Sequence, residues 1–345
     1  MRIRVLLVSL LVAGYASASA SAGSVSGVDV STIPPEITHA ERSTLRIYYS
    51  DDGWCSATRV AETLVLSAAH CFLGFNGEKE VAEIGPVFFE HDGRKEAARV
   101  VESGTYRLAD DRVQDWILFE PVSGADALHG IAIAEFPDSA GMAALLRNLG
   151  EFAGDRRGEP LWAITYPQIP FRRTFPRPGF RDVGSVFFAR GFLRSDLAYK
   201  LSVLFFLERN QSYDDQYSRE VPDFDVDTDA LWETLPTKED NPGARGIHIL
   251  YDLYSKDGDS VLYHSADIFR GSSGGGVFVE RTGHYLGLIC TQAAPVDTTN
   301  MFLPVQALFR VDRICEQSCV LSKLEKCRRL IGDRPPMPAP TRCRP

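Results

Sequence analysis

The sequence lacks an excess of positive charge. Its 345 residues include 37 Lys and Arg against 46 Asp and Glu, which gives a formal net charge of −9. A chain with this balance offers no general basic surface to nucleic-acid phosphates or anionic lipids. With 44% hydrophobic and 24% charged residues it has the composition of a globular chain, which excludes a disordered or collagen-like protein. We therefore expect a protein or peptide partner and no nucleic acid.

Long apolar runs are also missing, apart from one close to the N-terminus. Arg2 and Arg4 precede the apolar residues 5–14, and small residues follow at 16–22. This order is typical of a cleaved secretory signal, and the run is too short to cross a bilayer; an uncleaved anchor is the weaker alternative. We predict a signal peptide over residues 1–22 and a secreted or periplasmic mature chain that is not bound to the membrane after cleavage.

The sequence contains no internal repeat and no complete metal-binding loop. Aspartates alternate at residues 223–229, but neither frame supplies the glycine and glutamate that a hand-type calcium loop needs at its sixth and twelfth positions. These aspartates belong to residues 208–240, a stretch that contains eleven acidic and three basic residues. We predict no metal and no cofactor, with calcium at these aspartates as the weaker alternative. We interpret the acidic stretch as a solvated insertion over about residues 194–246. Its first part, residues 195–210, is densely apolar and predicts a buried helix.

Short apolar runs separated by turn residues are the main structural signal, and they predict antiparallel β-structure. They occur at residues 45–49, 64–67, 87–89, 97–101, 116–119, 161–166, 184–190, 246–254, 260–264, 277–280 and 285–291. The length suggests two units, which we place at 43–135 and 161–314 with a linker at 136–160. In the linker we predict a small helix over 138–150, capped by Ser139 and ended by Gly150. A further helix is predicted over 304–314, before a cysteine-containing tail at 315–345.

Three short segments contain residue types used in nucleophilic catalysis. His70 lies in a Ser-Ala-Ala-His-Cys segment directly after a predicted strand, and its small neighbours allow a partner side chain to come close. Asp115 stands immediately before another predicted strand. Ser273 lies in a Gly-Ser-Ser-Gly-Gly segment, whose glycines permit a tight turn with exposed amides. Each segment alone is weak evidence, because a lone histidine is usually structural and a Gly-Ser string is often only a flexible turn.

Taken together, in the order His, Asp, Ser, the segments resemble the trypsin and chymotrypsin family of serine proteases. The resemblance covers roughly residues 43–314 and implies two antiparallel six-stranded β-barrels, with the active site between them, a C-terminal helix and an inserted segment. It implies that His70 is the general base, that Asp115 orients it and that Ser273 is the nucleophile. The backbone amides of Gly271 and Ser273 would form the oxyanion hole.

The resemblance also implies a disulfide between Cys55 and Cys71, in the loop that contains the histidine. Five cysteines remain, so at least one is left out of intramolecular pairs. Cys290, in a predicted buried strand, is our candidate for that thiol. The other four would form two bridges whose connectivity the sequence leaves open; they are Cys315, Cys319, Cys327 and Cys343.

Two departures from the family pattern bear on mechanism. Animal-type members of the family have an aspartate at the position of Ser272, and this aspartate pairs with a newly freed N-terminus. The bacterial glutamyl endopeptidase-like and HtrA-like branches have Asn, Ser or another residue there, as this chain does. We therefore expect no activation through that ion pair. Cys290 falls where the family often has a serine that supports the catalytic aspartate, so we expect one hydrogen bond to Asp115 to be weaker or missing.

The candidate residue for substrate preference is Asp267, six residues before Ser273. At that spacing trypsin-like relatives place the acid that selects Arg or Lys, whereas bacterial-type relatives use an acid there to brace the loop, and Arg270 could neutralise it. Both readings stay open. The predicted function is a secreted serine endopeptidase; the alternative is an inactive protease-like module that binds a protein. An esterase of the α/β-hydrolase type is disfavoured, because its acid follows the serine.

Overall fold

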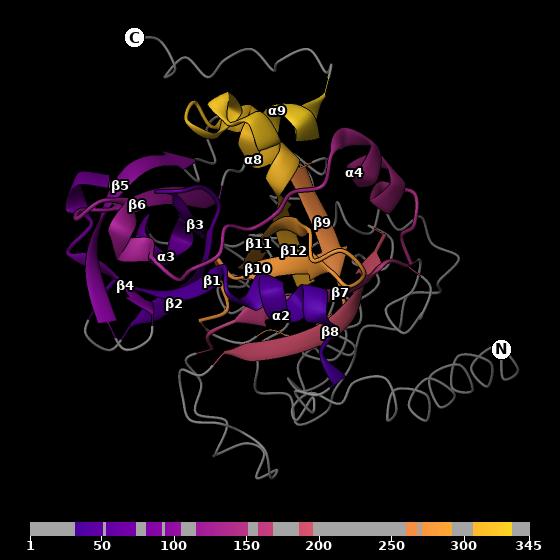
Figure 1. The fold of residues 1–345 in the computed structure, drawn as a ribbon, viewed down its shortest axis with the longest axis horizontal. Helices are drawn as coiled ribbons and strands as arrows, with labels where there is room; N and C mark the ends of the chain where they lie inside the picture. Colours follow the sequence, from indigo (N-terminus) through magenta and orange to yellow (C-terminus); the bar gives the residue numbers. More distant parts are fainter. Residues whose placement is uncertain are drawn as a thin grey trace, which may run out of the picture.

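In a computed structural model, the chain folds into two closed antiparallel β-barrels that lie beside each other (Figure 1). The structure describes residues 32–50, 53–73, 81–91, 94–104, 115–150, 158–167, 186–195, 260–266, 268, 271–291 and 306–332. This architecture confirms the predicted chymotrypsin-like double-barrel fold.

The first barrel has the strand order β1-β2-β3-β6-β5-β4. Its strands are β1 (Thr44–Tyr48), β2 (Trp54–Arg59), β3 (Val65–Ser67), β4 (Val87–His91), β5 (Arg94–Gly104) and β6 (Trp116–Pro121). Successive side chains of a strand point to opposite faces, and β6 shows the result. Ile117 and Phe119 pack inside the barrel, whereas Trp116 and Leu118 join a core shared with the second barrel. Both faces of β6 are therefore buried, which explains its unbroken apolar sequence.

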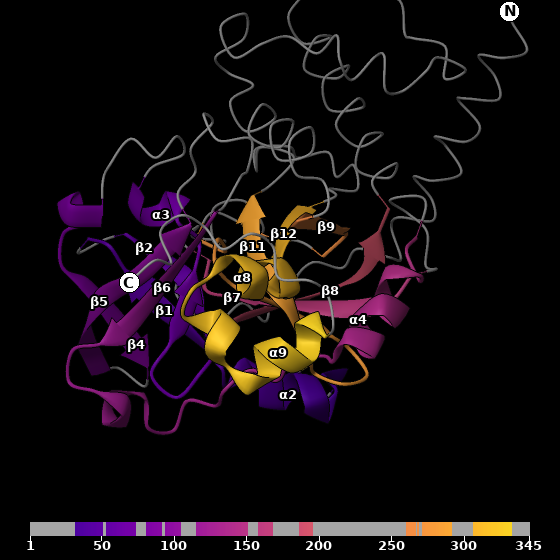
Figure 2. The same cartoon turned by 90° about the horizontal axis from the view of Figure 1, so that it is seen from above.

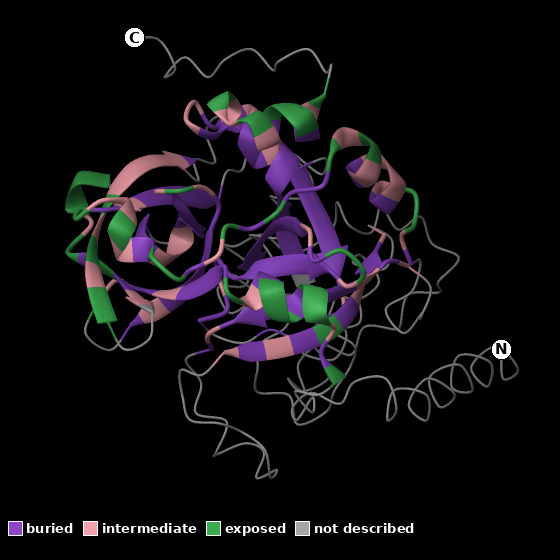
Figure 3. Cartoon of the chain, viewed as in Figure 1, coloured by how far each residue is buried: buried purple, intermediate pink, exposed green. Residues whose placement is uncertain are grey.

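The second barrel has the order β10-β11-β12-β9-β8-β7. Its strands are β7 (Pro160–Thr165), β8 (Phe187–Arg194), β9 (Val261–His264), β10 (Gly276–Val279), β11 (Tyr285–Thr291) and β12 (Gln306–Arg310). Gly287 in β11 allows close pairing with β12, because a Cβ atom there would lie 1.8 Å from the Phe309 carbonyl oxygen. Most residues of these strands are buried (Figure 3).

Helices lie around the barrels. They are α2 (Pro35–Glu41), α3 (His70–Leu73), α4 (Ser139–Leu146), α8 (Val311–Gln317) and α9 (Glu325–Ile331), with 3-10 turns η2 (Val81–Glu83), η4 (Ala125–Leu128) and η8 (Leu321–Lys323). Helix α8 packs on β11 and β12, and α9 contacts α4 and α8 (Figure 2). A disulfide joins Cys315 of α8 to Cys327 of α9. Cys319 is also disulfide-bonded.

Two helix predictions were wrong in detail. The linker helix ends at Leu146 and not at Gly150, and its cap is Asp138, whose side chain accepts a hydrogen bond from the Gly141 amide at 2.7 Å. Ser139 lies inside the helix because the aspartate before it supplies the capping oxygen. Residues 304–314 are not one helix: β12 occupies Gln306–Arg310, and only from Val311 is the chain helical. Strand β12 pairs with β11 and β9, and this pairing outweighs a local helical pattern.

Several predictions lie outside the described residues. They are the signal peptide at 1–22, the apolar stretch at 196–210, the acidic residues at 208–240, the possible hairpin strand at 246–254 and the end of the tail from 333 onwards. Among the residues that the structure does describe, no helix is both long and apolar enough to cross a membrane.

Candidate active site

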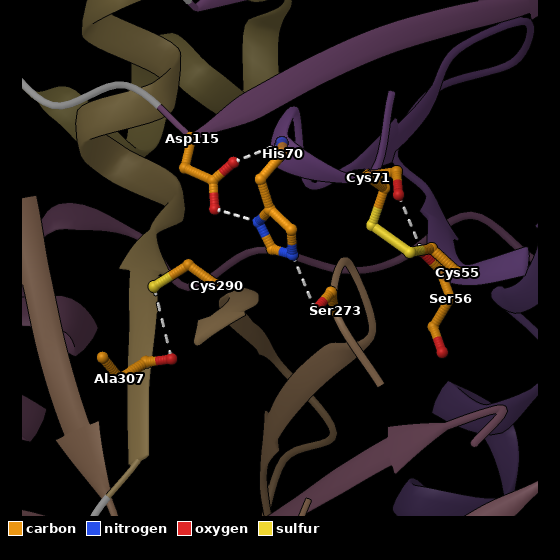
Figure 4. A network of polar contacts seen from close by, with 9 residues as sticks. Cys55, Ser56, His70, Cys71, Asp115, Ser273, Cys290 and Ala307 are labelled. Atoms are coloured by element: carbon orange, nitrogen blue, oxygen red, sulfur yellow. Dashed lines mark hydrogen bonds and ion pairs between the residues drawn. A yellow bond between two sulfur atoms is a disulfide. The ribbon is translucent and has the colours of Figure 1, made fainter. Parts of the chain in front are cut away.

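The three predicted catalytic side chains meet where the two barrels touch (Figure 4). His70 begins α3, three residues after β3 ends, and Asp115 immediately precedes β6. Since β3 and β6 are neighbours, with Ser67 opposite Ile117, the first barrel itself places these two side chains together. Ser273 comes from the second barrel, in the loop that leads into β10.

The distances between these side chains form a continuous chain of hydrogen bonds. The His70 Nδ1 atom lies 2.7 Å from Asp115 Oδ2, and the His70 backbone N–H donates to Asp115 Oδ1 at 2.8 Å. On the other side of the ring, His70 Nε2 lies 2.9 Å from Ser273 Oγ. Asp115 is only 4% exposed, so its carboxylate acts on the histidine with little screening by water. With Nδ1 protonated towards the aspartate, Nε2 is free to accept the serine proton.

The loop around Ser273 is held in a compact turn by hydrogen bonds of its backbone. Gly271 and Gly274 have φ angles of +89° and +80°, which favour glycine. The Gly275 amide donates to the Ser272 carbonyl, and the Gly274 amide donates to Ile289. Within the part of the chain that the structure describes, the amides of Gly271 and Ser273 donate no hydrogen bond. Amides that donate to no other group are the kind of donor that an oxyanion hole uses.

Ser272 has a buried environment that an aspartate could not share without a charged partner. Its hydroxyl donates to Thr165 Oγ1 at 3.1 Å, and both residues are completely buried. A neutral hydrogen bond between the loop and β7 therefore occupies the position at which animal-type relatives carry the aspartate of the activating ion pair. Sequence reasoning gave Thr165 no role, because its partner is 107 residues away.

Disulfide bonding in the first barrel follows the expectation. Cys55 in β2 is bonded to Cys71, the residue after His70. This bond ties α3 to the barrel wall and limits the movement of the histidine backbone. Cys290 is buried and retains its thiol, whose sulfur lies 3.4 Å from the Ala307 carbonyl oxygen.

The Cys290 thiol does not replace the serine that supports the aspartate in the family. Within the described residues, the Asp115 carboxylate accepts two hydrogen bonds, both from His70. The side chain of Cys290 instead contacts β12 (Figure 4). The orientation of Asp115 therefore depends on the histidine and on the strand that follows it.

Two remaining expectations concern specificity and metals. Asp267 lies outside the described residues, between the buried Ala266 and Ile268. No group of three or more His, Cys, Asp or Glu side chains in the described ranges is arranged to hold a metal ion.

The two barrels and their strand order define the class: this is a chymotrypsin-like double barrel, and the resemblance to trypsin- and chymotrypsin-like proteases is confirmed at the level of the fold. No family model and no curated protein matches the sequence.

Among solved structures, the chain is similar to an inactive form of Rv3671c from M. tuberculosis, with 14% identity, 87% of this chain and 97% of that chain covered, and a TM-score of 0.43. It is also similar to a serine endoprotease from Yersinia pestis, with 10% identity, 85% and 65% covered, and a TM-score of 0.42. A third similar structure is an inactivated protease paralogue of the scabies mite, with 11% identity, 79% and 88% covered, and a TM-score of 0.42. At these values the fold assignment rests on the barrels themselves.

Proposed function

We propose that the protein is a serine endopeptidase that hydrolyses peptide bonds through an acyl-enzyme. The observation that carries this proposal is the 2.9 Å separation of His70 Nε2 and Ser273 Oγ, with the opposite ring nitrogen held by Asp115 at 2.7 Å. A base within hydrogen-bond reach of the nucleophile, oriented by a third group, is the arrangement that acyl transfer needs.

The acylation step follows from these positions. Ser273 Oγ attacks the scissile carbonyl carbon while His70 Nε2 takes the hydroxyl proton. Asp115 stabilises the imidazolium that forms and keeps its own charge. The carbonyl oxygen becomes an oxyanion, to which the amides of Gly271 and Ser273 donate. Collapse of the tetrahedral intermediate breaks the C–N bond, and His70 returns the proton to the leaving amine.

Deacylation repeats the sequence with water as the nucleophile. His70 removes a proton from a water molecule, the resulting hydroxide attacks the acyl carbon, and Ser273 leaves as its hydroxyl after receiving that proton. The same donors and the same base serve both halves of the reaction, so no cofactor is needed.

We further propose that the enzyme works outside the cytosol. The Cys55–Cys71 and Cys315–Cys327 disulfides are compatible with an oxidising compartment, and the N-terminal residues 1–22 have the pattern of a secretory signal. Because Ser272 carries no charge with which to hold a freed terminal amine, and its hydroxyl donates to Thr165, we expect activity after signal removal alone. A strict requirement for a second cut between residues 23 and 43 would contradict this expectation.

A labelling experiment tests the catalytic proposal against the alternative of an inactive binding module. A serine-directed fluorophosphonate should modify Ser273, and Ser273→Ala should lower kcat about a million-fold with unchanged thermal stability. Ser123→Ala is the matched control, because Ser123 is an exposed serine of the first barrel that contacts Glu96. Hydrolysis at the normal rate by Ser273→Ala contradicts the proposed nucleophile. Absence of both labelling and hydrolysis in the wild type supports the binding module.

For specificity we propose that Asp267 contributes to selection of Arg or Lys on the N-terminal side of the cut. The support is its position six residues before Ser273, and a carboxylate there would form a charge-assisted hydrogen bond worth about 1.5–3 kcal/mol. Cleavage profiling of a peptide library, with wild type and Asp267→Asn side by side, tests the assignment. A wild-type profile without enrichment of basic residues indicates that the aspartate braces the loop.

A further inference from the structure

Ser56 lies at the point where the first barrel touches the loop of the nucleophile. It is the third residue of β2 and is completely buried. Its hydroxyl donates to the Gly271 carbonyl oxygen at 2.9 Å and accepts from the Tyr166 amide at 2.8 Å. Its backbone amide donates to the Ser273 carbonyl at 3.0 Å. A single residue of the first barrel is therefore bonded at both ends of the Gly271–Ser273 segment.

These contacts fix the peptide groups next to the two amides on which oxyanion binding would depend. The carbonyls of Gly271 and Ser273 are held by Ser56, and the Ser272 carbonyl between them is held by the Gly275 amide. Gly271 has no Cβ, so the peptide groups on either side of it rotate at little steric cost. The Ser56 hydroxyl fixes the peptide group that joins Gly271 to Ser272, and the Gly271 amide belongs to the peptide group on the other side of the same Cα atom. The Ser273 amide lies between the two peptide groups that Ser56 fixes.

The neighbour of Ser56 in β2 holds the other half of the site. Successive residues of a strand face opposite sides, and Cys55 points into the first barrel, where it is bonded to Cys71 beside His70. Ser56 points towards the second barrel, where Gly274 comes so close that a Cβ atom there would lie 2.3 Å from the Ser56 carbonyl oxygen. Two adjacent residues therefore set the position of the base and of the nucleophile loop.

We propose that Ser56 is a positioning residue that holds the Gly271 and Ser273 amides in the orientation that binds the oxyanion. This inference rests on the proposed function, because it concerns the same reaction. It assigns to the hydroxyl a task separate from joining the barrels: Ser56 acts through the Gly271 carbonyl and does not touch the substrate. Its removal should therefore affect the tetrahedral state more than the bound substrate.

A matched control separates this role from the general cost of losing a buried hydroxyl. Ser43 is 1% exposed and immediately precedes β1, and its hydroxyl donates to the carbonyl of Ala40 in α2 at 2.6 Å. Ser56→Ala and Ser43→Ala each remove one buried hydroxyl that donates to a carbonyl. We expect Ser56→Ala to lower kcat at least about tenfold with KM within twofold, because small misplacements of catalytic groups cost up to about 100-fold. Ser43→Ala should leave both constants unchanged.

An oxyanion analogue provides a readout that a merely structural role would not move. A peptide aldehyde, which forms a tetrahedral adduct with the serine, should bind Ser56→Ala at least about tenfold more weakly, as expected when donors to the oxyanion are displaced. The peptide acid of the same sequence, which forms no adduct, should bind both proteins equally. Equal weakening of aldehyde and acid, or wild-type kcat in Ser56→Ala, overturns the proposal.

Hydrogen–deuterium exchange tests the positioning without relying on activity. Ser56→Ala should accelerate exchange at the Gly274 and Gly275 amides, whereas exchange in β10 and β11 should match that of the wild type and Ser43→Ala. Unchanged exchange in the loop contradicts the proposal whether or not the protein hydrolyses peptides. An inactive wild type with accelerated loop exchange in Ser56→Ala would count against the proposed function and would support the positioning contact.

Discussion

The two barrels share one topology but divide the work of the site unequally. The first barrel supplies the base and the carboxylate as an assembled pair, since β3 and β6 bring His70 and Asp115 together within it. The second barrel contributes the nucleophile loop, whose Ser273 reaches its base only across the junction. The orientation of His70 is thus a property of one barrel, whereas the proposed catalysis depends on the docking of the two.

The hydrophobic cores of the two barrels also differ in size and extent. The first barrel encloses a small core of its own, which includes Ile47, Val65 and Phe119. The core of the second barrel is larger and continues through the outer face of the first, where it includes Leu66 and Trp116. Separation of the barrels would therefore expose apolar surface that belongs mainly to the second core. The hydrophobic effect holds the nucleophile loop against the base.

The strongest test of this division is Asp115→Asn, which alters only the first barrel. The amide can no longer stabilise an imidazolium, and it favours the wrong histidine tautomer, so we expect kcat to fall about 10⁴-fold. The loop of the second barrel and its fluorophosphonate-accessible serine should remain folded, as judged by hydrogen exchange. Asp126→Asn, in the η4 turn of the same barrel, is the control and should keep full activity. A loss below tenfold for Asp115→Asn would mean that the histidine is oriented by other groups.

Removal of the Cys55–Cys71 disulfide probes the stability of the first barrel. The bond closes a loop with a sequence separation of 16, and in the chain-entropy model its loss costs about 3 kcal/mol in the free energy of unfolding. We expect Cys55→Ala with Cys71→Ala to show this loss in urea denaturation. The corresponding pair of substitutions at Cys315 and Cys327 should destabilise the α8–α9 region and leave exchange around His70 unchanged. If both double variants loosened the histidine loop equally, the barrels would unfold as one unit.

The apolar strands and the three catalytic motifs could be predicted from the sequence. Features that depend on partners far away in the chain could not. Apolar runs placed β1, β3 and β6 close to their observed bounds, and three motifs indicated the residues that meet at the junction. Strand β2 was not predicted as a strand, because Cys55, Ser56 and Thr58 are small or polar and show no apolar run. Ser56 and Thr58 contact residues of the second barrel, which the local sequence does not reveal. For the same reason Ser56 was given no function: its partner Gly271 is 215 residues away.

Loss of the contacts between the C-terminal helices and the first barrel should lower the free energy of unfolding by less than loss of the disulfide. Glu102 of β5 accepts hydrogen bonds from Ser318 Oγ at 2.5 Å, from the Cys319 amide at 2.8 Å and from the Val320 amide at 3.2 Å. We expect Glu102→Ala to cost about 2 kcal/mol in the free energy of unfolding, since it leaves these donors without their charged acceptor. Glu96 lies on the same strand as Glu102, and its contact with Ser123 is exposed. Glu96→Ala should therefore lower the free energy of unfolding far less. Equal losses for the two variants would show that Glu102 does not connect the helices to the barrel.

The smallest expected effect is a pH dependence that belongs to the second barrel. His264 is completely buried beside Arg194; burial and then the guanidinium charge lower its pKa from 6.5 to about 3. The unfolded chain therefore binds a proton below about pH 6.5 that the folded chain refuses, so stability falls as the pH drops through this window. Between pH 7 and 5.5 the loss amounts to about 1 kcal/mol.

Denaturation curves at these two pH values check the effect. His264→Leu should reduce the difference between them by about 1 kcal/mol, because the titrating group is gone. His129→Gln, at an exposed position of the first barrel, is the control and should retain the wild-type difference. A His264→Leu variant with an unaltered pH difference would assign the acid sensitivity to other groups.

The distance along the chain between Ser56 and its partner also determines when the proposed site can assemble during biosynthesis. A polypeptide that emerges N-terminus first presents a paired His70 and Asp115 long before residue 273 of 345 has appeared. Contacts of such long sequence separation form late, because the entropy of closing a large loop must be overcome first. A nascent chain halfway through synthesis therefore holds the proposed base without the proposed nucleophile. The proposed triad is completed in one late event, when the second barrel closes onto β2.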